Sequence, residues 1–231
     1  MALRVLTYNV RALRDDPAAV ARVIAACRPD VACLQELPRF PGWRARRRGL
    51  ARAAGLVPAV DRRAGGVAVW VRPGVPVAAA AHRVLRRYAG LHVRALALAV
   101  VAPAGRPLVV GSIHLDLHAG ARLAHTAEAL DLLRSAADAA GAPRLLAGDV
   151  NCAPGSAAWR ELTADLVDTG AAAPRGAAAT FTARRPRSRI DAVFASSGPA
   201  VRGAGVPVDL LDAADVAAAS DHRPVLAEIE V

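Results

Sequence analysis

Polar side chains that could do chemistry stand at the ends of apolar runs throughout the sequence. Asn9 follows Val-Leu-Thr-Tyr, Glu36 follows Val-Ala-Cys-Leu-Gln, and His114 follows Val-Val-Gly-Ser-Ile. The later positions of this kind are Asp149, Asn151, Asp191, Asp221 and His222. A carboxylate at the end of a buried strand is costly unless a partner compensates its charge. If these strand ends meet at one rim, their oxygen atoms form a site for a hard divalent cation with histidine beside it.

Each of these residues also has an ordinary structural interpretation when it is taken alone. Asn9 could close a turn, Glu36 could point to water, and a single His114 is more often a satisfied core histidine. Gly148–Asn151 could be an Asx turn, and Asp221 could cap a turn before Pro224. The prediction of a site therefore depends on the joint occurrence of these residues in this order.

That order closely resembles the endonuclease/exonuclease/phosphatase superfamily. The matching stretches extend from residue 7 to residue 225, almost the whole chain. They are Thr7-Tyr8-Asn9-Val10, Leu34-Gln35-Glu36, Ile113-His114-Leu115, Gly148-Asp149-Val150-Asn151-Cys152-Ala153-Pro154, Arg189-Ile190-Asp191 and Ser220-Asp221-His222-Arg223-Pro224-Val225. The aspartate motif at 148–151 is weak evidence alone, whereas all six stretches in sequence are specific.

The resemblance implies a divalent cation and assigns three residues to it. Glu36 resembles the principal metal ligand of the family, and Asn9 and Asp221 would complete or support the site. Oxygen ligands favour Mg²⁺, with Mn²⁺ as a substitute, over zinc. The cation would polarise a phosphoryl oxygen and offset the charge that builds up on the leaving group.

The resemblance also implies roles for five catalytic residues. His222 resembles the family's general base or phosphate contact, and Asp191 would orient its ring and raise its pKa. Asp149 would position or deprotonate the attacking water, or protonate the leaving oxygen. Asn151 would donate hydrogen bonds to the phosphorus centre, and His114 would contact a non-bridging oxygen. The reaction would be in-line hydrolysis of a phosphoester without a covalent enzyme intermediate.

The elements that must position these residues follow from hydrophobic patterning and turn residues. Helices are predicted at 17–27, 43–54, 122–140 and 156–162. Strands are predicted at 3–7, 31–36, 66–71, 75–85, 91–101, 108–114, 144–147, 190–195, 201–208 and 224–231. The pattern and the resemblance predict an α/β fold, a four-layer α-β-β-α sandwich. Two mostly antiparallel sheets would pack face to face with helices outside, in a single domain over residues 1–231.

The charge of the chain favours an anionic partner. Thirty basic residues, all of them arginine, stand against twenty acidic ones and give a net charge of +10. Four arginines directly precede Asp191, where a loop at the rim of the site could contact substrate phosphate: Arg184, Arg185, Arg187 and Arg189. A solvated charge run is an equally good interpretation of that group. A second cluster, Arg44, Arg46, Arg47, Arg48 and Arg52, has the spacing of an exposed helix face.

Composition also narrows the compartment and the class of protein. No apolar run approaches about 18 residues, so a membrane span is not expected. Three cysteines without a Cys-X-X-Cys pair argue against a disulfide scaffold and fit a reducing compartment. The sequence has no pattern of a secretory leader at its start. We therefore expect a monomeric, cytoplasmic protein.

Three functions remain to be compared. A nuclease that hydrolyses phosphodiesters of DNA or RNA is favoured by the motifs and the basic charge, so nucleic acid is the preferred partner. The same machinery could act on a small or lipid-linked phosphate ester such as a nucleotide, an inositol phosphate or sphingomyelin. A catalytically dead binding module is disfavoured because it would have lost catalytic residues, whereas every one of them is present.

Overall fold

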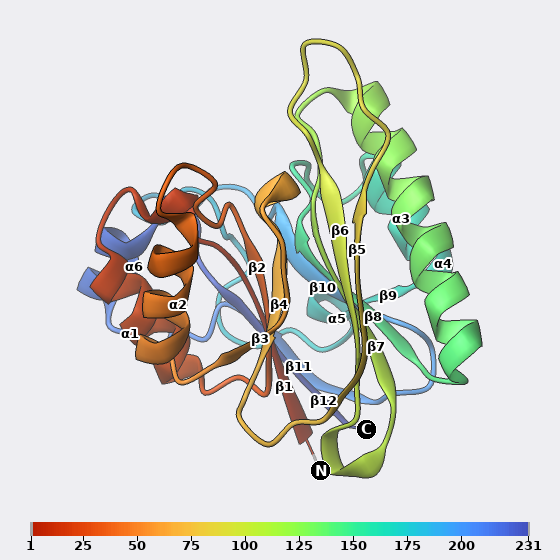
Figure 1. Cartoon of the computed structure of the whole chain (residues 1–231), viewed down its shortest axis with the longest axis horizontal. Coiled ribbons are helices and arrows are strands. Elements are labelled where there is room, and N and C mark those ends of the chain that lie inside the picture. The colour runs from red at the N-terminus through yellow and green to blue at the C-terminus, as the bar shows by residue number, and fades with distance from the viewer. Residues whose placement is uncertain (1, 231) are drawn as a thin grey trace.

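Two six-stranded β-sheets pack face to face, and helices cover the outer face of each (Figure 1). The computed structural model describes residues 2–230. The first sheet has the order β11-β12-β1-β2-β4-β3, and the second has the order β5-β6-β7-β8-β10-β9. All neighbouring strands are antiparallel except the pairs β1–β2 and β7–β8, one in each sheet. The predicted four-layer sandwich with mostly antiparallel sheets is therefore confirmed.

The strands and helices have the following bounds. The first sheet contains β1 (Ala2–Asn9), β2 (Val31–Gln35), β3 (Val57–Asp61), β4 (Ala68–Val71), β11 (Val201–Gly205) and β12 (Val225–Glu230). The second contains β5 (Val77–Val84), β6 (Ala95–Val101), β7 (Leu108–His114), β8 (Arg144–Asp149), β9 (Val167–Asp168) and β10 (Asp191–Ala195). The α-helices are α1 (Pro17–Cys27), α2 (Trp43–Ala53), α3 (Ala119–Ala140), α4 (Ala157–Asp165), α5 (Thr169–Ala172) and α6 (Ala213–Ala219). Single 3₁₀ turns are η1 (Arg11–Leu13), η2 (Ala64–Gly66) and η3 (Pro103–Gly105).

Alternation along each central strand decides which side chains face the other sheet. In β1, Leu3 and Val5 pack in the core between the sheets, whereas Leu6 and Tyr8 pack under α1, α2 and α6. Successive strand residues point to opposite faces, so the odd-numbered positions of β1 point inward as far as Asn9. The polar end of the strand is therefore delivered to the space between the two sheets.

The helices of the outer layers are stabilised by capping residues and by packing of their apolar faces on the sheets. Asp16 accepts hydrogen bonds from the backbone amides of Ala18 and Ala19, and Pro17 occupies the first turn of α1, as its sequence predicts. The apolar faces of α1, α2 and α6 cover the first sheet, and α3 and α4 cover the second. Of the part of the chain that the structure describes, no helix is both long and apolar enough to cross a bilayer.

Several elements differ from the sequence prediction. β3 was not predicted, because Pro58 interrupts its apolar run and such strands survive only at a sheet edge, where β3 lies. The short elements β9, α5 and α6 were also missed. The predicted exposed face of α2 is wrong at one position: the Arg47 side chain is fully buried. It donates hydrogen bonds to the carbonyl oxygens of Leu37 and Pro38 and forms an ion pair with Asp61.

Candidate active site

Three of the strand-end residues form one row across the second sheet. In the strand register, His114 of β7 is the partner of Asp149 of β8, and Asp149 is the partner of Asp191 of β10. All three belong to the inward-facing sets of their strands, since Val110, Leu145 and Val193 face the inter-sheet core. The side chains of all three are almost completely buried. The row lies where β7 and β8 end and β10 begins.

Gly148 allows this row to form. It is the register partner of Ile113, and a Cβ atom at this position would lie 2.0 Å from the carbonyl oxygen of Ile113. A larger residue would push β8 away from β7 and separate His114 from Asp149. The glycine of the aspartate motif is therefore a requirement of close strand approach.

Asn9 connects the row to the first sheet. Its side-chain amide Nδ2 donates to Asp149 Oδ2 over 3.0 Å and to Glu36 Oε1 over 3.1 Å. One residue layer deeper, Gln35 accepts from Thr7 and donates to Ser112 of the facing sheet. These buried groups bridge the two sheets. The spacing between the sheets near Asn9 and Asp149 is therefore held by the hydrogen bonds of Asn9 and by those of Gln35 beneath it.

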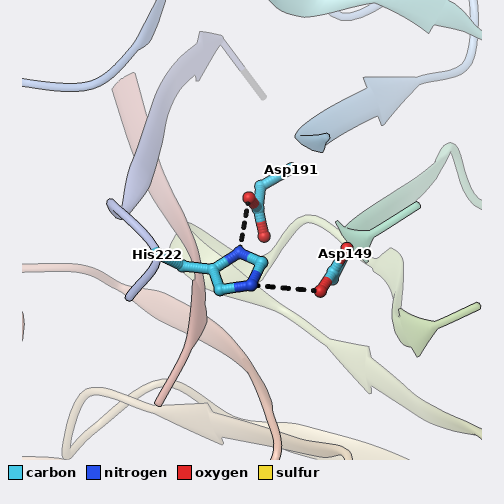
Figure 2. Close-up of side chains that lie close together, drawn as sticks. All are labelled: Asp149, Asp191 and His222. Atoms are coloured by element: carbon cyan, nitrogen blue, oxygen red, sulfur yellow. Dashed lines mark hydrogen bonds and ion pairs between the residues drawn. The ribbon is translucent and has the colours of Figure 1, made fainter. Parts of the chain in front are cut away.

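His222 lies between the two aspartates of the row (Figure 2). Its Nδ1 is 2.9 Å from Asp191 Oδ2, and its Nε2 is 3.7 Å from Asp149 Oδ2. The Ser220 hydroxyl accepts from the His222 backbone amide and donates to the Asn9 carbonyl, which anchors the segment to β1. The Phe181 ring covers the imidazole with its centroid 4.9 Å away.

The two histidines have opposite electrostatic environments. Burial alone would lower the pKa of His222, but the charge and hydrogen bond of Asp191 outweigh burial and raise it to about 9. Burial, then the charge of Arg94, holds the pKa of His114 well below its usual range. Burial and the charge of Asp191 raise the pKa of Asp149 to about 7. At neutral pH the site therefore holds an imidazolium at His222 and a neutral imidazole at His114.

Two residues of the site have left-handed backbone conformations that non-glycine residues rarely adopt. Glu36 has φ 51° and Asn151 has φ 55°. Such a conformation costs about 1–2 kcal/mol for an L-residue. In Asn151 the cost is offset locally, since its amide nitrogen donates to Asp149 Oδ1 and its side chain donates to the Leu115 carbonyl. Both residues turn the chain directly after a buried strand and place their side chains at the cleft.

These residues line a cleft of about 520 Å³ at the end of the sandwich. The predicted residues Glu36, His114, Asp149, Asn151 and His222 all contribute to its walls. Of the residues that the structure describes, one group has the proximity of metal ligands: Asp149, Asp191 and His222, whose donor atoms lie within 4.8 Å of one another. The cleft therefore brings carboxylates, histidines and an amide to a single point that is open to solvent.

Comparison with known families agrees with this arrangement. The family model for the Endonuclease/Exonuclease/phosphatase family matches residues 6–222. The chain belongs to this family. Members of the Endonuclease/Exonuclease/phosphatase family are hydrolases that act on phosphoesters, so the predicted resemblance and reaction class are confirmed.

Solved structures show the same fold over the full length of the chain. A family member from Bacteroides vulgatus superposes with a TM-score of 0.82 at 20% identity, covering 100% of this chain and 99% of that one. The mannosyl-6-phosphatase of Bacteroides thetaiotaomicron VPI-5482 gives 0.82 at 18% identity, covering 99% and 100%. The human Nocturnin catalytic domain with bound sulfate gives 0.71 at 18% identity, covering 99% and 94%. No curated protein sequence matches this one.

Sequence reasoning missed the basic residues of the cleft. Arg14, Arg39 and Arg94 line it, and none lies in a motif of the Endonuclease/Exonuclease/phosphatase family used above. Arg94 is almost completely buried, and its Nε lies 3.4 Å from Asp116 Oδ2. A signal for it existed: Arg94 directly precedes the apolar strand β6, a strand-end position like that of Asp191 at the start of β10. For Arg39 the signal in the sequence was its closeness to Glu36, which it follows by three positions.

Asp221, the third residue that its motif assigns to the cation, contacts an arginine. It does not line the cleft, and its carboxylate lies 3.3 Å from Arg11 Nε. The chain bends at Asp221, where the Ser220 hydroxyl accepts from the His222 amide, and the Asp221 side chain lies beside Arg11. The structure thus brings Asn9 and Glu36 together and leaves the third predicted metal ligand in an ion pair.

The arginine group before Asp191 also lies elsewhere. None of Arg184, Arg185, Arg187 and Arg189 is among the residues that line the cleft. The loop folds back on itself through hydrogen bonds from the amides of Arg187 and Ser188 to the Phe181 carbonyl, which turns Phe181 inward. Arg184 donates to a carbonyl of α6 instead, and Arg189 forms a two-bond ion pair with Asp168. None of the four arginines therefore contributes to the walls of this cleft.

Proposed function

We propose that this chain is a divalent-cation-dependent phosphodiesterase that uses water as its nucleophile. The observation that carries the proposal is the His222 ring held between Asp191 and Asp149 on the floor of an open cleft. An imidazolium fixed by one carboxylate beside a second, buried carboxylate supplies a hydrogen-bond donor and a proton acceptor at one point.

The donor set of the site fits a hard cation. Three carboxylates, from Glu36, Asp149 and Asp191, converge on one amide and one imidazole. The Asp191 Oδ1 atom is buried without a hydrogen-bond partner in the described chain. The site has more carboxylate oxygens than cationic side chains to pair with them. Such a set of oxygen donors suits Mg²⁺ or Mn²⁺. We assign Glu36 and Asn9 to the cation, which when bound would polarise the phosphoryl group and offset charge on the leaving oxygen.

The protein's own residues account for the rest of the reaction. Asp149 accepts a proton as water attacks phosphorus in line with the leaving oxygen. His222, His114 and Arg94 donate hydrogen bonds to the non-bridging oxygens, where charge develops, and Asn151 supports the same oxygens. The bond from phosphorus to the leaving oxygen breaks, and that oxygen takes a proton from solvent. A diester thus yields a monoester and an alcohol, with no bond to the enzyme.

A phosphodiester of nucleic acid is the favoured substrate. The cleft is open and basic, and Arg14, Arg39 and Arg94 add positive charge beside the catalytic row. The net charge of +10 would attract a polyanion at long range. A diester needs room on both sides of phosphorus, and the cleft continues beyond the catalytic residues toward Arg39 and Phe40.

A monoester of a sugar is the second candidate. The Bacteroides thetaiotaomicron mannosyl-6-phosphatase matches this chain end to end, with 99% and 100% coverage. A short chain with an open cleft suits a small phosphate ester as well.

Hydrolysis of one phosphodiester and two phosphomonoesters tests the proposal and separates the candidates. With Mg²⁺ or Mn²⁺, bis(4-nitrophenyl) phosphate should be hydrolysed faster than 4-nitrophenyl phosphate and mannose 6-phosphate, and chelator should abolish the activity. Asp149→Ala should lower kcat about 10²- to 10⁴-fold, the range for loss of a general base. The exposed Asp138→Ala on α3 is the matched control and should retain full activity. Full activity of Asp149→Ala would refute the mechanism, and a preference for the monoesters would favour the phosphatase.

A further inference from the structure

The catalytic cleft continues into a second depression, which we call the side cleft. Its volume is about 660 Å³, and its lining residues are Arg39, Phe40, Arg63, Ala64, Gly65, Arg87 and Val93. Arg39, Phe40, Gly65 and Val93 also line the catalytic cleft, so the two form one continuous surface. Residues 85–94 connect β5 to β6 and extend past the strand ends, opposite the chain termini (Figure 1).

Three loops supply the charge of the side cleft. Arg39 comes from the β2–α2 connection, Arg63 from the β3–β4 connection, and Arg87 from the β5–β6 connection. No aspartate or glutamate lines the side cleft, and none of the three arginines forms an ion pair within residues 2–230. Arg63 Nε donates to the Arg39 carbonyl over 2.7 Å, which fixes two of these loops to each other.

Many surface arginines of the described chain lack a carboxylate partner, as Arg52 and Arg106 do, while others are paired, as Arg22 is with Asp215. The side cleft differs in that three such guanidinium groups, from three separate loops, converge on one depression. Guanidinium groups left without carboxylates in a depression present planar sets of donors that match phosphate oxygens. The side cleft is therefore built to receive anionic groups in addition to the one at the catalytic centre.

An exposed aromatic ring stands where the two clefts join. Phe40 is 64% exposed and lines both of them. A second aromatic residue, Phe181, lines the catalytic cleft against His222. Aromatic residues are only 3% of the chain, so two at one cleft are a concentration of this residue type. A ring exposed among arginines offers a stacking surface for a nucleobase, which an inorganic anion could not use.

We propose that the side cleft binds single-stranded nucleic acid next to the scissile phosphodiester. Arg39, Arg63 and Arg87 contact successive backbone phosphates, and Phe40 stacks on an unpaired base. A duplex would present phosphates to the arginines but keep its bases within its own stack, so it would leave Phe40 without a partner. This inference rests on the proposed phosphodiesterase activity and names its substrate class and the residues that select it.

Binding and turnover of oligothymidylates test the inference. The variant is Arg39→Ala/Arg63→Ala/Arg87→Ala, and the matched control is Arg28→Ala/Arg52→Ala/Arg106→Ala, which removes three exposed arginines outside both clefts. Wild-type kcat/KM should rise with chain length from two to ten nucleotides. The side-cleft variant should lose this rise and bind a fluorescent decamer at least tenfold more weakly. Arg63→Ala/Arg87→Ala, which keeps Arg39 in the catalytic cleft, should leave kcat on bis(4-nitrophenyl) phosphate unchanged.

Salt dependence and a single substitution give independent readouts. Each lost phosphate contact on a single strand reduces the slope of log affinity against log salt by about 0.7, so the triple variant should reduce it by about 2. Phe40→Ala should weaken decamer binding about tenfold without changing that slope. Thermal unfolding checks that each variant is folded.

The outcomes separate this inference from the proposed function. Decamer binding is measured by anisotropy in chelator, so it needs no activity. Equal losses in the side-cleft variant and the control, a kcat/KM that does not depend on length, or tighter binding of duplex than of single strand would each overturn the inference. Hydrolysis of no phosphodiester by the wild type would instead refute the proposed function and leave the binding result to stand.

Discussion

Asn9 and Asp149 are 140 positions apart in the sequence, and a 3.0 Å hydrogen bond from the Asn9 amide to the Asp149 carboxylate joins the two sheets at the cleft floor. The same amide also donates to Glu36. One side chain thus fixes the spacing of two carboxylates that come from opposite halves of the sandwich. This makes Asn9 the residue whose loss should disturb the site most at the least cost to the fold.

Asn9→Ala should lower kcat about 10- to 100-fold, because hydrogen bonds to charged groups contribute about 1.5–3 kcal/mol. The measurement is hydrolysis of bis(4-nitrophenyl) phosphate at saturating Mg²⁺. Thr7→Val is the control, since Thr7 points inward on the same strand but bonds to Gln35 below the site. It should lower stability and leave kcat within about twofold. Equal kcat values for Asn9→Ala and the wild type would show that Asn9 does not organise the site.

The His222–Asp191 pair predicts a pH dependence in the protein without metal. The pKa of His222 is raised to about 9, so the stability that the pair contributes is complete below the ordinary histidine pKa of about 6.5 and is lost as the pH rises through about 9. In Asp191→Asn, burial should dominate and the His222 pKa should fall well below 9.

NMR titration of the His222 ring in chelator measures this directly. Urea unfolding at pH 6 and at pH 10 measures the linked free energy of unfolding. The difference in unfolding free energy between wild type and Asp191→Asn should be larger at pH 6 than at pH 10. The prediction fails if the imidazole of His222 titrates at the same pH in both proteins.

The left-handed backbone at Glu36 predicts that function opposes stability at this residue. Both Glu36→Ala and Glu36→Gly should abolish hydrolysis. Only glycine relieves the conformation, so Glu36→Gly should be about 1 kcal/mol more stable than Glu36→Ala in urea unfolding. Arg28 has φ 43° outside the cleft and serves as a control pair. The unfolding free energy of Arg28→Gly should exceed that of Arg28→Ala by a similar amount, and both variants should retain full activity. A more stable alanine variant at position 36 would refute the strain at this site.

The buried Arg47 should behave as a structural residue of the active-site loop. Arg47→Met leaves Asp61 and the carbonyls of Leu37 and Pro38 without their donor, which should cost about 3 kcal/mol of unfolding free energy. Because these carbonyls directly follow Glu36, kcat should fall as well. The exposed neighbour Arg46→Met should change stability by less than about 0.5 kcal/mol. Similar unfolding midpoints for Arg47→Met and Arg46→Met would show that the buried hydrogen bonds of Arg47 do not stabilise this loop.

The sequence predicted those site residues that lie at the ends of strands. Asn9, His114, Asp149 and Asp191 were identifiable because each polar residue ends or begins an apolar strand, and strand alternation then decides which face it takes. The four-layer architecture followed from the same patterning together with the family resemblance. Glu36 and Asn151 were found by their motifs, although nothing in their residue types indicated the left-handed conformations that place them.

The remaining features depend on how loops run in space. Arg39, Arg63 and Arg87 come together because three connections meet at one end of the sandwich, and no motif encodes that meeting. The charge run before Asp191 lies outside the cleft lining for the same reason, since its loop folds back through backbone hydrogen bonds to Phe181. Arg47 looked exposed because its neighbours on α2 are all charged, and only the carbonyls of another loop explain its burial.

The hydrogen bonds that build the cleft floor join positions that are remote in the chain, as Asn9 is from Asp149 and from Ser220. A contact of this kind forms only after long loops have closed, which makes it a late event in folding. No fragment that lacks either half of the chain can contain the catalytic arrangement. Hydrolytic activity regained during refolding is therefore a measure of completed assembly of the whole sandwich, and spectroscopic signals of local helix and strand formation should precede it.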